Sequence, residues 1–175
     1  IDAILYKELP FKKKRLESPI IFDLKLKPFY VVTEGSLIGD KILTLSDTTV
    51  GILARKEDYE AYLKQVYDLT NLIDKFLHNP DVLKDTLFTL DKLTPIEIKY
   101  KHLHKTTEEV ISDIIESIEK RKYFDFDSGD AGKDFRDEIT NFQGNYLNKP
   151  ENAPSFIWAL RLGKIQFIVS LIDLI

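Results

Sequence analysis

Two segments of the chain repeat apolar side chains at three- and four-residue steps, the spacing of an amphipathic helix. The first covers residues 56–78, with an apolar stripe of Tyr59, Tyr62, Leu63, Val66, Leu69, Ile73, Phe76 and Leu77. We expect it to end at Asn79-Pro80, because proline disfavours helical geometry in the residue before it. The second covers residues 106–122, where Thr106 and Glu109 have the spacing of a capping box.

Residues 20–55 are predicted to form strands. Residues 20–27 alternate between apolar and charged side chains, the period-two pattern of a half-buried strand. Residues 29–33 and 37–45 are two further β-rich runs, separated by a predicted turn at Glu34-Gly35-Ser36. Gly39-Asp40 breaks the last of these strands. We therefore expect an antiparallel meander in the first third of the chain.

The later segments are less regular. Residues 82–90 fit either a strand or one and a half further turns of helix, whereas residues 95–100 are predicted to form a strand. Residues 123–155 are polar and rich in glycine and proline, with a short helix expected around residues 133–142. Residues 156–175 are predicted to form a β-hairpin that turns at Gly163-Lys164, with a buried helix as the alternative.

These elements predict a single α+β domain over residues 1–175, with a mostly antiparallel or mixed sheet and two main amphipathic helices. Its parts are a β-meander (1–55), a helix–strand–helix centre (56–122), a polar loop region (123–155) and a terminal β-hairpin (156–175). A chain of 175 residues is long enough to build one hydrophobic core.

Net charge, cysteine content and the length of apolar runs exclude several classes of function. The net charge of −4, from 25 basic and 29 acidic residues, gives no general attraction to nucleic acid. The absence of cysteine excludes disulfides, thiolate zinc sites and cysteine nucleophiles. No apolar run reaches the ~18 residues of a membrane span, and no secretory signal precedes the first charged residues. We therefore expect an intracellular protein, cytoplasmic or nuclear, that does not enter a membrane. Because methionine is absent even at position 1, we also expect a fragment of a longer chain.

One stretch combines residue types and spacing that point to a chemistry. Pro80-Asp81 is followed, sixteen residues after the aspartate, by Glu97-Ile98-Lys99 on a predicted strand. On that strand Glu97, Lys99 and Lys101 share one face. This arrangement resembles the signature of the PD-(D/E)XK nuclease superfamily, over residues 56–122 and the last predicted strand. It departs from the family because no strand separates the first helix from Asp81.

The resemblance implies metal-dependent hydrolysis of phosphodiesters, with nucleic acid as the partner. Asp81 and Glu97 would hold a magnesium ion, which prefers oxygen ligands and activates a water. Lys99 would orient that water or stabilise charge on the phosphate. Basic residues that could contact a phosphate backbone follow directly, namely Lys101, His102, His104 and Lys105.

Other candidates have simpler structural interpretations beside the functional one. Residues 125–132 form an acidic loop suggestive of calcium, but the register of an EF-hand fails because Arg136 stands where the bidentate glutamate belongs. His102 and His104 would supply half of a zinc or nickel site, or simply end a strand. The basic run 12–15 fits a nucleic-acid or targeting patch, or a solvated loop. The tyrosines of the first helix could stack on bases, but at helical spacing they are more typical of a core or an interface.

The alternative to the nuclease is a non-catalytic subunit that binds a protein partner or serves as a scaffold. Two amphipathic helices would pack on the sheet, and exposed apolar surface would dock the partner. The very apolar segment 156–175 is the most suitable surface.

Overall fold

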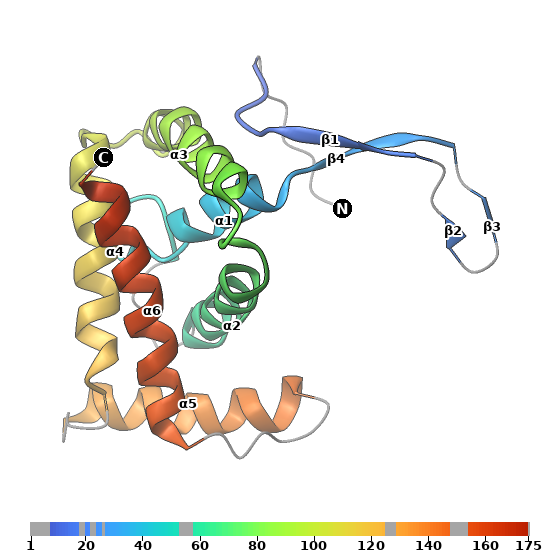
Figure 1. Ribbon diagram of the computed structural model, residues 1–175. Helices are drawn as coiled ribbons and strands as arrows, with labels where there is room; N and C mark the ends of the chain where they lie inside the picture. The colour runs from blue at the N-terminus through green and yellow to red at the C-terminus, as the bar shows by residue number, and fades with distance from the viewer. Residues whose placement is uncertain are drawn as a thin grey trace.

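The computed structural model describes residues 8–17, 20–21, 24–25, 27–52, 58–124, 129–147 and 154–174. These residues form a mostly helical structure (Figure 1). In chain order the elements are β1 (Lys13–Leu16), β2 (Ile20–Ile21), β3 (Leu24–Lys25), β4 (Phe29–Val32), α1 (Glu34–Leu43), α2 (Tyr59–Phe76), α3 (Pro80–Tyr100), α4 (Thr107–Lys122), α5 (Asp130–Tyr146) and α6 (Ser155–Asp173).

The predicted α+β class with a large sheet is therefore wrong. Within the described residues the strands make only two antiparallel pairs, β1 with β4 and β2 with β3. The β1–β4 pair, in which Lys13 faces Val32 and Leu16 faces Phe29, projects away from the helices (Figure 1). A hairpin this small cannot supply a core, so the helices supply it.

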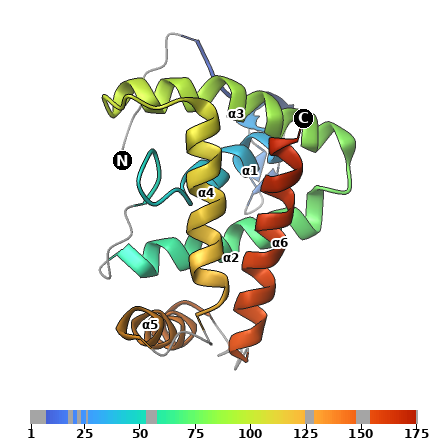
Figure 2. The same cartoon turned by 90° about the vertical axis from the view of Figure 1, so that its left-hand side faces the viewer.

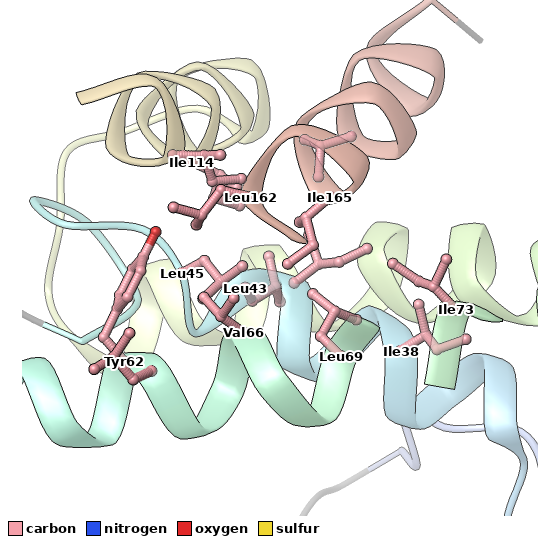
Figure 3. Close-up of a cluster of buried hydrophobic side chains, with 14 of the residues drawn as sticks. Ile38, Leu43, Leu45, Tyr62, Val66, Leu69, Ile73, Ile114, Leu162 and Ile165 are labelled. Carbon is pink, nitrogen blue, oxygen red and sulfur yellow. The ribbon is translucent and has the colours of Figure 1, made fainter. Parts of the chain in front are cut away.

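The helices pack around α1, which contacts α2, α3 and α4. Helices α4 and α6 lie side by side and run in opposite directions, with α3 across one end of the pair and α5 across the other (Figures 1 and 2). Apolar side chains from α1, α2, α4 and α6 meet in the centre (Figure 3). Fully burying each large apolar side chain contributes roughly 1.5–3 kcal/mol, so this cluster is the main source of stability.

The two helices predicted from periodicity are confirmed as α2 and α4. In α4 the predicted capping box is present, because Thr106 Oγ1 accepts a hydrogen bond from the Glu109 N–H (3.2 Å). The Glu109 carboxylate accepts one in return from the Thr106 N–H (2.8 Å). The helix expected around residues 133–142 also exists, as the longer α5.

The strand predicted for residues 37–45 is wrong, because residues 34–43 form α1. Thr33 caps the helix by accepting a hydrogen bond from the Ser36 N–H. The glycines that suggested a turn instead let α1 lie close to α3. A Cβ at Gly35 would lie 2.2 Å from the Val82 carbonyl oxygen, and one at Gly39 would lie 3.0 Å from the Thr86 carbonyl oxygen.

Buried hydroxyl groups complete the contact between α1 and α3. Thr86 donates a hydrogen bond to the Gly35 carbonyl (3.0 Å), and Thr89 donates one to the Ser36 hydroxyl (2.8 Å). Ser36 also accepts a hydrogen bond from the Lys12 N–H (2.8 Å), which ties the start of the β1–β4 hairpin to the same point. The hydroxyl groups of Ser36, Thr86 and Thr89 are fully buried and each has a hydrogen-bond partner, so none is left unsatisfied in the core.

The strand predicted for residues 95–100 is also wrong, because α3 continues to Tyr100. Asn79 caps the helix by accepting from the Asp81 N–H (3.0 Å), and Pro80 occupies the first turn, where its missing N–H has no cost. Pro95 lies inside the helix and removes one backbone hydrogen bond. Because Pro95 is exposed while Leu93 and Thr94 are buried, packing of the inner face outweighs this local penalty.

The predicted C-terminal β-hairpin is wrong as well. The alternative, a buried helix, is correct in that residues 155–173 form a helix, but only one side of it is buried. Gly163-Lys164, the predicted turn, lies in the middle of α6. In the described part of the chain, no helix has both the length and the apolar character that crossing a membrane requires.

We expect Gly35→Ala to lower the free energy of unfolding by about 2 kcal/mol or more, because the new methyl group collides with the backbone of α3. Gly144→Ala is the matched control: it lies in α5 with no atom within 4 Å of its added Cβ. That variant should gain about 0.5–1 kcal/mol from helix propensity. Urea unfolding followed by circular dichroism measures both values, and equal effects of the two substitutions would contradict the close approach of α1 and α3.

Candidate functional site

The structure does not bring together the two predicted magnesium ligands. Asp81 lies in the first turn of α3 and Glu97 in its last turn. Sixteen residues of α-helix, at 1.5 Å each, separate them by about 24 Å along the axis. Asp81 instead forms an exposed ion pair with Lys84 (3.1 Å). The two carboxylates therefore cannot share one ion in this fold.

The predicted strand face is also dispersed. On a helix, Glu97 and Lys101 lie one turn apart on the same side, whereas Lys99 points to a different side. Lys101 donates hydrogen bonds to the carbonyl groups of Val50 and Gly51, so its ammonium holds the loop after α1. Lys99 is exposed.

Glu97 has a different carboxylate neighbour, Asp40 of α1. Burial raises the pKa of Glu97; Lys101 acts in the opposite direction, and the negative charge of Asp40 adds to the increase. Burial also raises the pKa of Asp40. Sequence reasoning missed this pair because Asp40 was assigned to a break in a strand, 57 positions before Glu97. Among the described residues no group of three or more histidine, aspartate or glutamate side chains is placed to hold a metal ion.

The two histidines lie where α3 ends. His102 has a φ of 56°, and its N–H donates to the Lys99 carbonyl (3.2 Å), while the Leu103 N–H donates to the Ile98 carbonyl (3.0 Å). This pattern is a Schellman motif, which satisfies the last carbonyl groups of a helix. Of the basic residues beyond it, Lys105 forms an ion pair with Glu109 (3.1 Å).

The remaining sequence candidates fit structural roles or lie outside the described residues. Residues 125–128 of the acidic loop are outside them, and α5 begins at Asp130. In the basic run, Lys14 pairs with Glu34, Arg15 pairs with Glu17, and the Lys12 ammonium lies over the Phe88 ring. Tyr62 is buried in the core, and two other tyrosines of α2 pack against aromatic rings of α5, namely Tyr59 and Tyr67.

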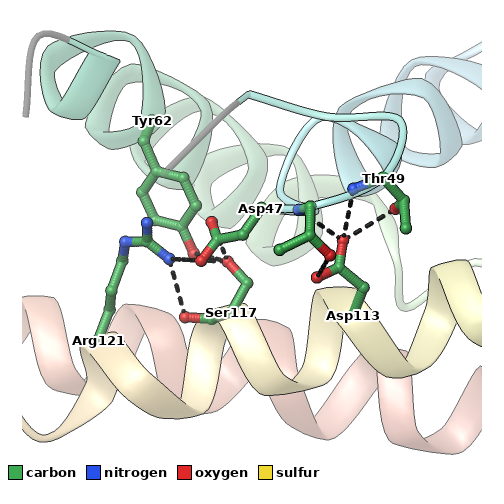
Figure 4. Close-up of polar contacts among 7 residues, drawn as sticks. Asp47, Thr49, Tyr62, Asp113, Ser117 and Arg121 are labelled. Carbon is green, nitrogen blue, oxygen red and sulfur yellow. Dashed lines mark hydrogen bonds and ion pairs between the residues drawn. The ribbon is translucent and has the colours of Figure 1, made fainter. Parts of the chain in front are cut away.

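The strongest polar cluster in the described structure joins the loop after α1 to α4 (Figure 4). Asp113 accepts four hydrogen bonds of 2.8–3.0 Å from the N–H and hydroxyl groups of Thr48 and Thr49. Two turns further along α4, Arg121 donates to the Asp47 carboxylate (2.8 Å). Ser117 donates to the other oxygen of Asp47 (2.9 Å), so the loop is held at two points.

The Asp47–Arg121 ion pair is nearly dry, because the two side chains are 4% and 9% exposed. The guanidinium also lies 4.2 Å from the centre of the Tyr62 ring. Burial raises the pKa of Tyr62 to about 12, with Arg121 acting in the opposite direction. Burial works against the charged form of Arg121, but Tyr62 and Asp47 outweigh it and raise the pKa of Arg121. The Tyr62 hydroxyl, with a pKa of about 12, and the Arg121 guanidinium, with a raised pKa, both keep their protons at neutral pH, which fits a structural role for these contacts.

A cavity of about 370 Å³ adjoins the pair between α2, α4 and α5. Its walls combine the ion pair with aromatic and small side chains, namely Asp47, Tyr59, Lys120, Arg121, Phe124, Ala131, Gly132 and Phe135. No described wall residue is a serine, threonine, cysteine or histidine, the side chains that most often act as nucleophile or base. Sequence reasoning missed these contacts between α4 and the loop after α1. The signal was present, because Asp113, Ser117 and Arg121 recur every four residues beside an apolar stripe.

Helix α6 carries the most distinctive surface. Its inner side is fully buried in the core through Trp158, Leu162, Ile165 and Val169. On the opposite side five large apolar side chains are exposed, four in α6 and one at its C-cap, Leu174. Their exposed fractions are 55% for Phe156, 62% for Leu160, 63% for Phe167, 43% for Leu171 and 82% for Leu174. At 100° per residue these five project within about 60° of one another. We refer to these five residues together with Gly163 as the outer α6 face.

The outer α6 face contains a groove. Gly163 lies between Leu160 and Phe167, and a Cβ there would meet only the Lys122 side chain, at 3.8 Å. The groove has a volume of about 690 Å³ and is lined by Lys122, Phe156, Ala159, Leu160, Gly163 and Lys164. An apolar stripe with a groove beside it can receive apolar side chains from another surface.

Comparisons of the chain with protein-family models, with curated proteins and with solved structures found no match. The function of the site therefore has to be inferred from its geometry and chemistry.

We expect Arg121→Ala to lower the free energy of unfolding by about 3–5 kcal/mol, because it leaves the Asp47 carboxylate buried without its cation. Lys84→Ala removes one partner of an exposed ion pair and is the control, with an expected change within about 0.5 kcal/mol. Urea unfolding of both variants measures the difference. Similar small losses in the two variants would show that the Asp47–Arg121 pair is not desolvated.

The shifted carboxyl groups predict a pH dependence of stability. Because the folded pKa of Glu97 is raised above 4.5, its contribution to stability is complete below that value and is lost as the pH rises through the folded pKa. Glu97→Gln removes this loss and should gain stability relative to the unsubstituted chain between about pH 4 and pH 7. Urea unfolding at several pH values measures this difference.

Glu109→Gln is a control of opposite sign. A hydrogen bond from the Thr106 backbone, with a further one from Lys105, lowers the pKa of Glu109. Its contribution is present above 4.5 and is lost as the pH falls through the folded pKa. This variant should therefore lose stability relative to the unsubstituted chain as the pH rises to 4.5 from below. Parallel curves for the two variants would contradict the buried environment of Glu97.

Proposed function

We propose that this chain is a non-catalytic interaction subunit that docks a protein partner through the outer α6 face. The observation that carries the proposal is the second apolar side of α6. A helix that is apolar all round is normally buried all round. Here the inner side is covered by the core, while the outer side stays exposed in the described structure.

The energetics favour docking on this face. Monomeric proteins rarely expose contiguous apolar patches larger than a few hundred Å², and such patches commonly mark interaction sites. Burying a large apolar side chain completely contributes roughly 1.5–3 kcal/mol, so covering Phe156, Leu160 and Phe167 would stabilise a complex substantially. The groove beside Gly163 adds a pocket of the kind that surrounds energetically dominant interface residues.

Core packing and polar contacts hold α6 in place beneath the outer α6 face. Trp158 is fully buried and packs edge-on against Phe142 of α5, with ring centres 5.6 Å apart. On one flank Lys164 forms an ion pair with Asp74 of α2 (2.5 Å), and on the other Lys122 of α4 donates to Gln166 (2.5 Å). A surface held at both flanks needs little ordering on binding, which lowers the entropic cost of association.

Metal-dependent phosphodiester hydrolysis is the other proposal, and the geometry supports it less. It requires two carboxylates at one ion, and α3 holds Asp81 and Glu97 about 24 Å apart. The neighbouring pair Asp40 and Glu97 supplies two carboxylates near Lys101, but a pair of acidic side chains alone defines no metal site.

Site-specific photo-crosslinking tests the interaction proposal. A photoreactive phenylalanine analogue in place of Phe167 or Leu160 should join the intact protein to one partner, identified by mass spectrometry. The same analogue in place of Tyr100, exposed on α3, is the control and should give no such product. An excess of unlabelled protein should compete, whereas unlabelled Phe167→Glu protein should not.

Two results would contradict the interaction proposal. One is crosslinking at Phe167 that does not exceed crosslinking at Tyr100. The other is Mg²⁺-dependent cleavage of DNA or RNA that disappears in Glu97→Ala and Lys99→Ala while both variants stay folded, which would favour hydrolysis instead.

A further inference from the structure

We infer that the partner on the outer α6 face is a second copy of this chain, with the two α6 helices packed antiparallel about a two-fold axis. This inference rests on the proposed function, because it names the partner. It depends on the spacing of the face, the position of the groove and the charges at its rim.

The outer α6 face has almost the same spacing when read from either end. Counted from Phe156, the other members follow after 4, 7, 11, 15 and 18 residues; counted back from Leu174, they follow after 3, 7, 11, 14 and 18. No position differs by more than one residue, which is about 1.5 Å along a helix. An antiparallel copy therefore places apolar side chains against apolar side chains along the whole length of about 28 Å.

The antiparallel alignment also places the projecting Phe167 ring of each copy opposite the groove at Gly163 of the other. Phe156 faces Leu174 of the second copy, Leu160 faces Leu171, and Gly163 faces Phe167. Gly163 is the floor of the groove, and Phe167 is the most exposed aromatic side chain of the face. In a two-fold interface each contact occurs twice, so the Phe167 ring of each copy enters the groove of the other.

Charge does not oppose the pairing. Lys164 borders the face, but its ammonium is already paired with Asp74 of the same chain. The other cation at the groove, Lys122, is held by Gln166. The charge of Lys164 is therefore neutralised within its own chain, and the Lys122 ammonium is hydrogen-bonded to the neutral amide oxygen of Gln166, which limits free charge at the centre of the interface, where charge is normally depleted.

A protein surface fits this face better than a membrane surface. Helices that lie on membranes carry lysine and arginine along the polar side, which attract anionic lipid. Beside the outer α6 face the charge of Lys164 is neutralised by Asp74, and the whole chain has a net charge of −4. An interface between two single helices is small, so we expect a dissociation constant of roughly 1–100 μM.

Analytical ultracentrifugation of the intact chain, over concentrations spanning that range, tests the inference. Unsubstituted protein should shift from monomer to dimer, and Phe167→Glu should raise the dissociation constant by at least about 30-fold. Gly163→Leu should raise the dissociation constant likewise, because the new side chain fills the groove. Within the monomer an added Cβ meets only the Lys122 side chain, at 3.8 Å, so this variant should unfold at a similar urea concentration to the unsubstituted chain. Tyr100→Glu changes an exposed aromatic on α3 and should dimerise normally.

Cysteine pairs test the direction, since the chain has no cysteine of its own. A mixture of Leu160→Cys and Leu171→Cys chains, treated with a short bis-maleimide, should give the mixed crosslinked dimer. Each variant alone should give little product. A parallel arrangement would reverse this pattern, because each residue would then face its own copy.

The possible outcomes separate this inference from the proposed function. A chain that stays monomeric throughout, or a dimer unaffected by both Phe167→Glu and Gly163→Leu, overturns the self-association. Crosslinking of Phe167 to a different protein would then leave the docking function intact. Binding to phosphatidylglycerol vesicles that is lost in Phe167→Glu, without dimerisation, would overturn both in favour of a lipid surface.

Discussion

The fold depends on the close approach of α1 to α3. Gly35 and Gly39 leave no side chain between the two helices, so the backbone of α3 lies where a Cβ would otherwise stand. Buried hydroxyl groups from Ser36, Thr86 and Thr89 then satisfy one another and the α1 backbone. Because α1 also contacts α2 and α4, its position on α3 determines where the remaining helices can pack.

Helix α4 provides the second constraint, through charge rather than size. Asp113 and Arg121 hold the loop that follows α1 at two points, and both side chains are almost fully buried. Arg121 forms a buried ion pair with Asp47. Such a pair contributes little net stability compared with apolar packing, but removing one partner leaves an uncompensated charge in the core. The Asp47–Arg121 ion pair therefore specifies one position of the loop, which fits a structural role.

The interaction that we propose uses the surface of α6. The same helix closes the core with one side and presents Phe156, Leu160 and Phe167 with the other. The two roles depend on each other, because the buried inner side holds the exposed residues at constant spacing. The antiparallel self-association that we propose depends on that spacing.

Local signals in the sequence determined α2 and α4 correctly, because periodicity and a capping box are properties of neighbouring residues. They failed for α1, α3 and α6, where Gly35, Pro95 and Gly163 have more than one local interpretation. A glycine forms a turn or admits a close neighbour according to what lies opposite it, and only tertiary packing decides which. The same holds for the predicted site: sixteen residues can return two carboxylates to one point through a strand pair, but in one continuous helix they separate them by about 24 Å. Exposed apolar surface within residues 156–175 was expected on a β-hairpin, whereas the fold forms a helix there and, by burying one side of α6, decided which residues face outward.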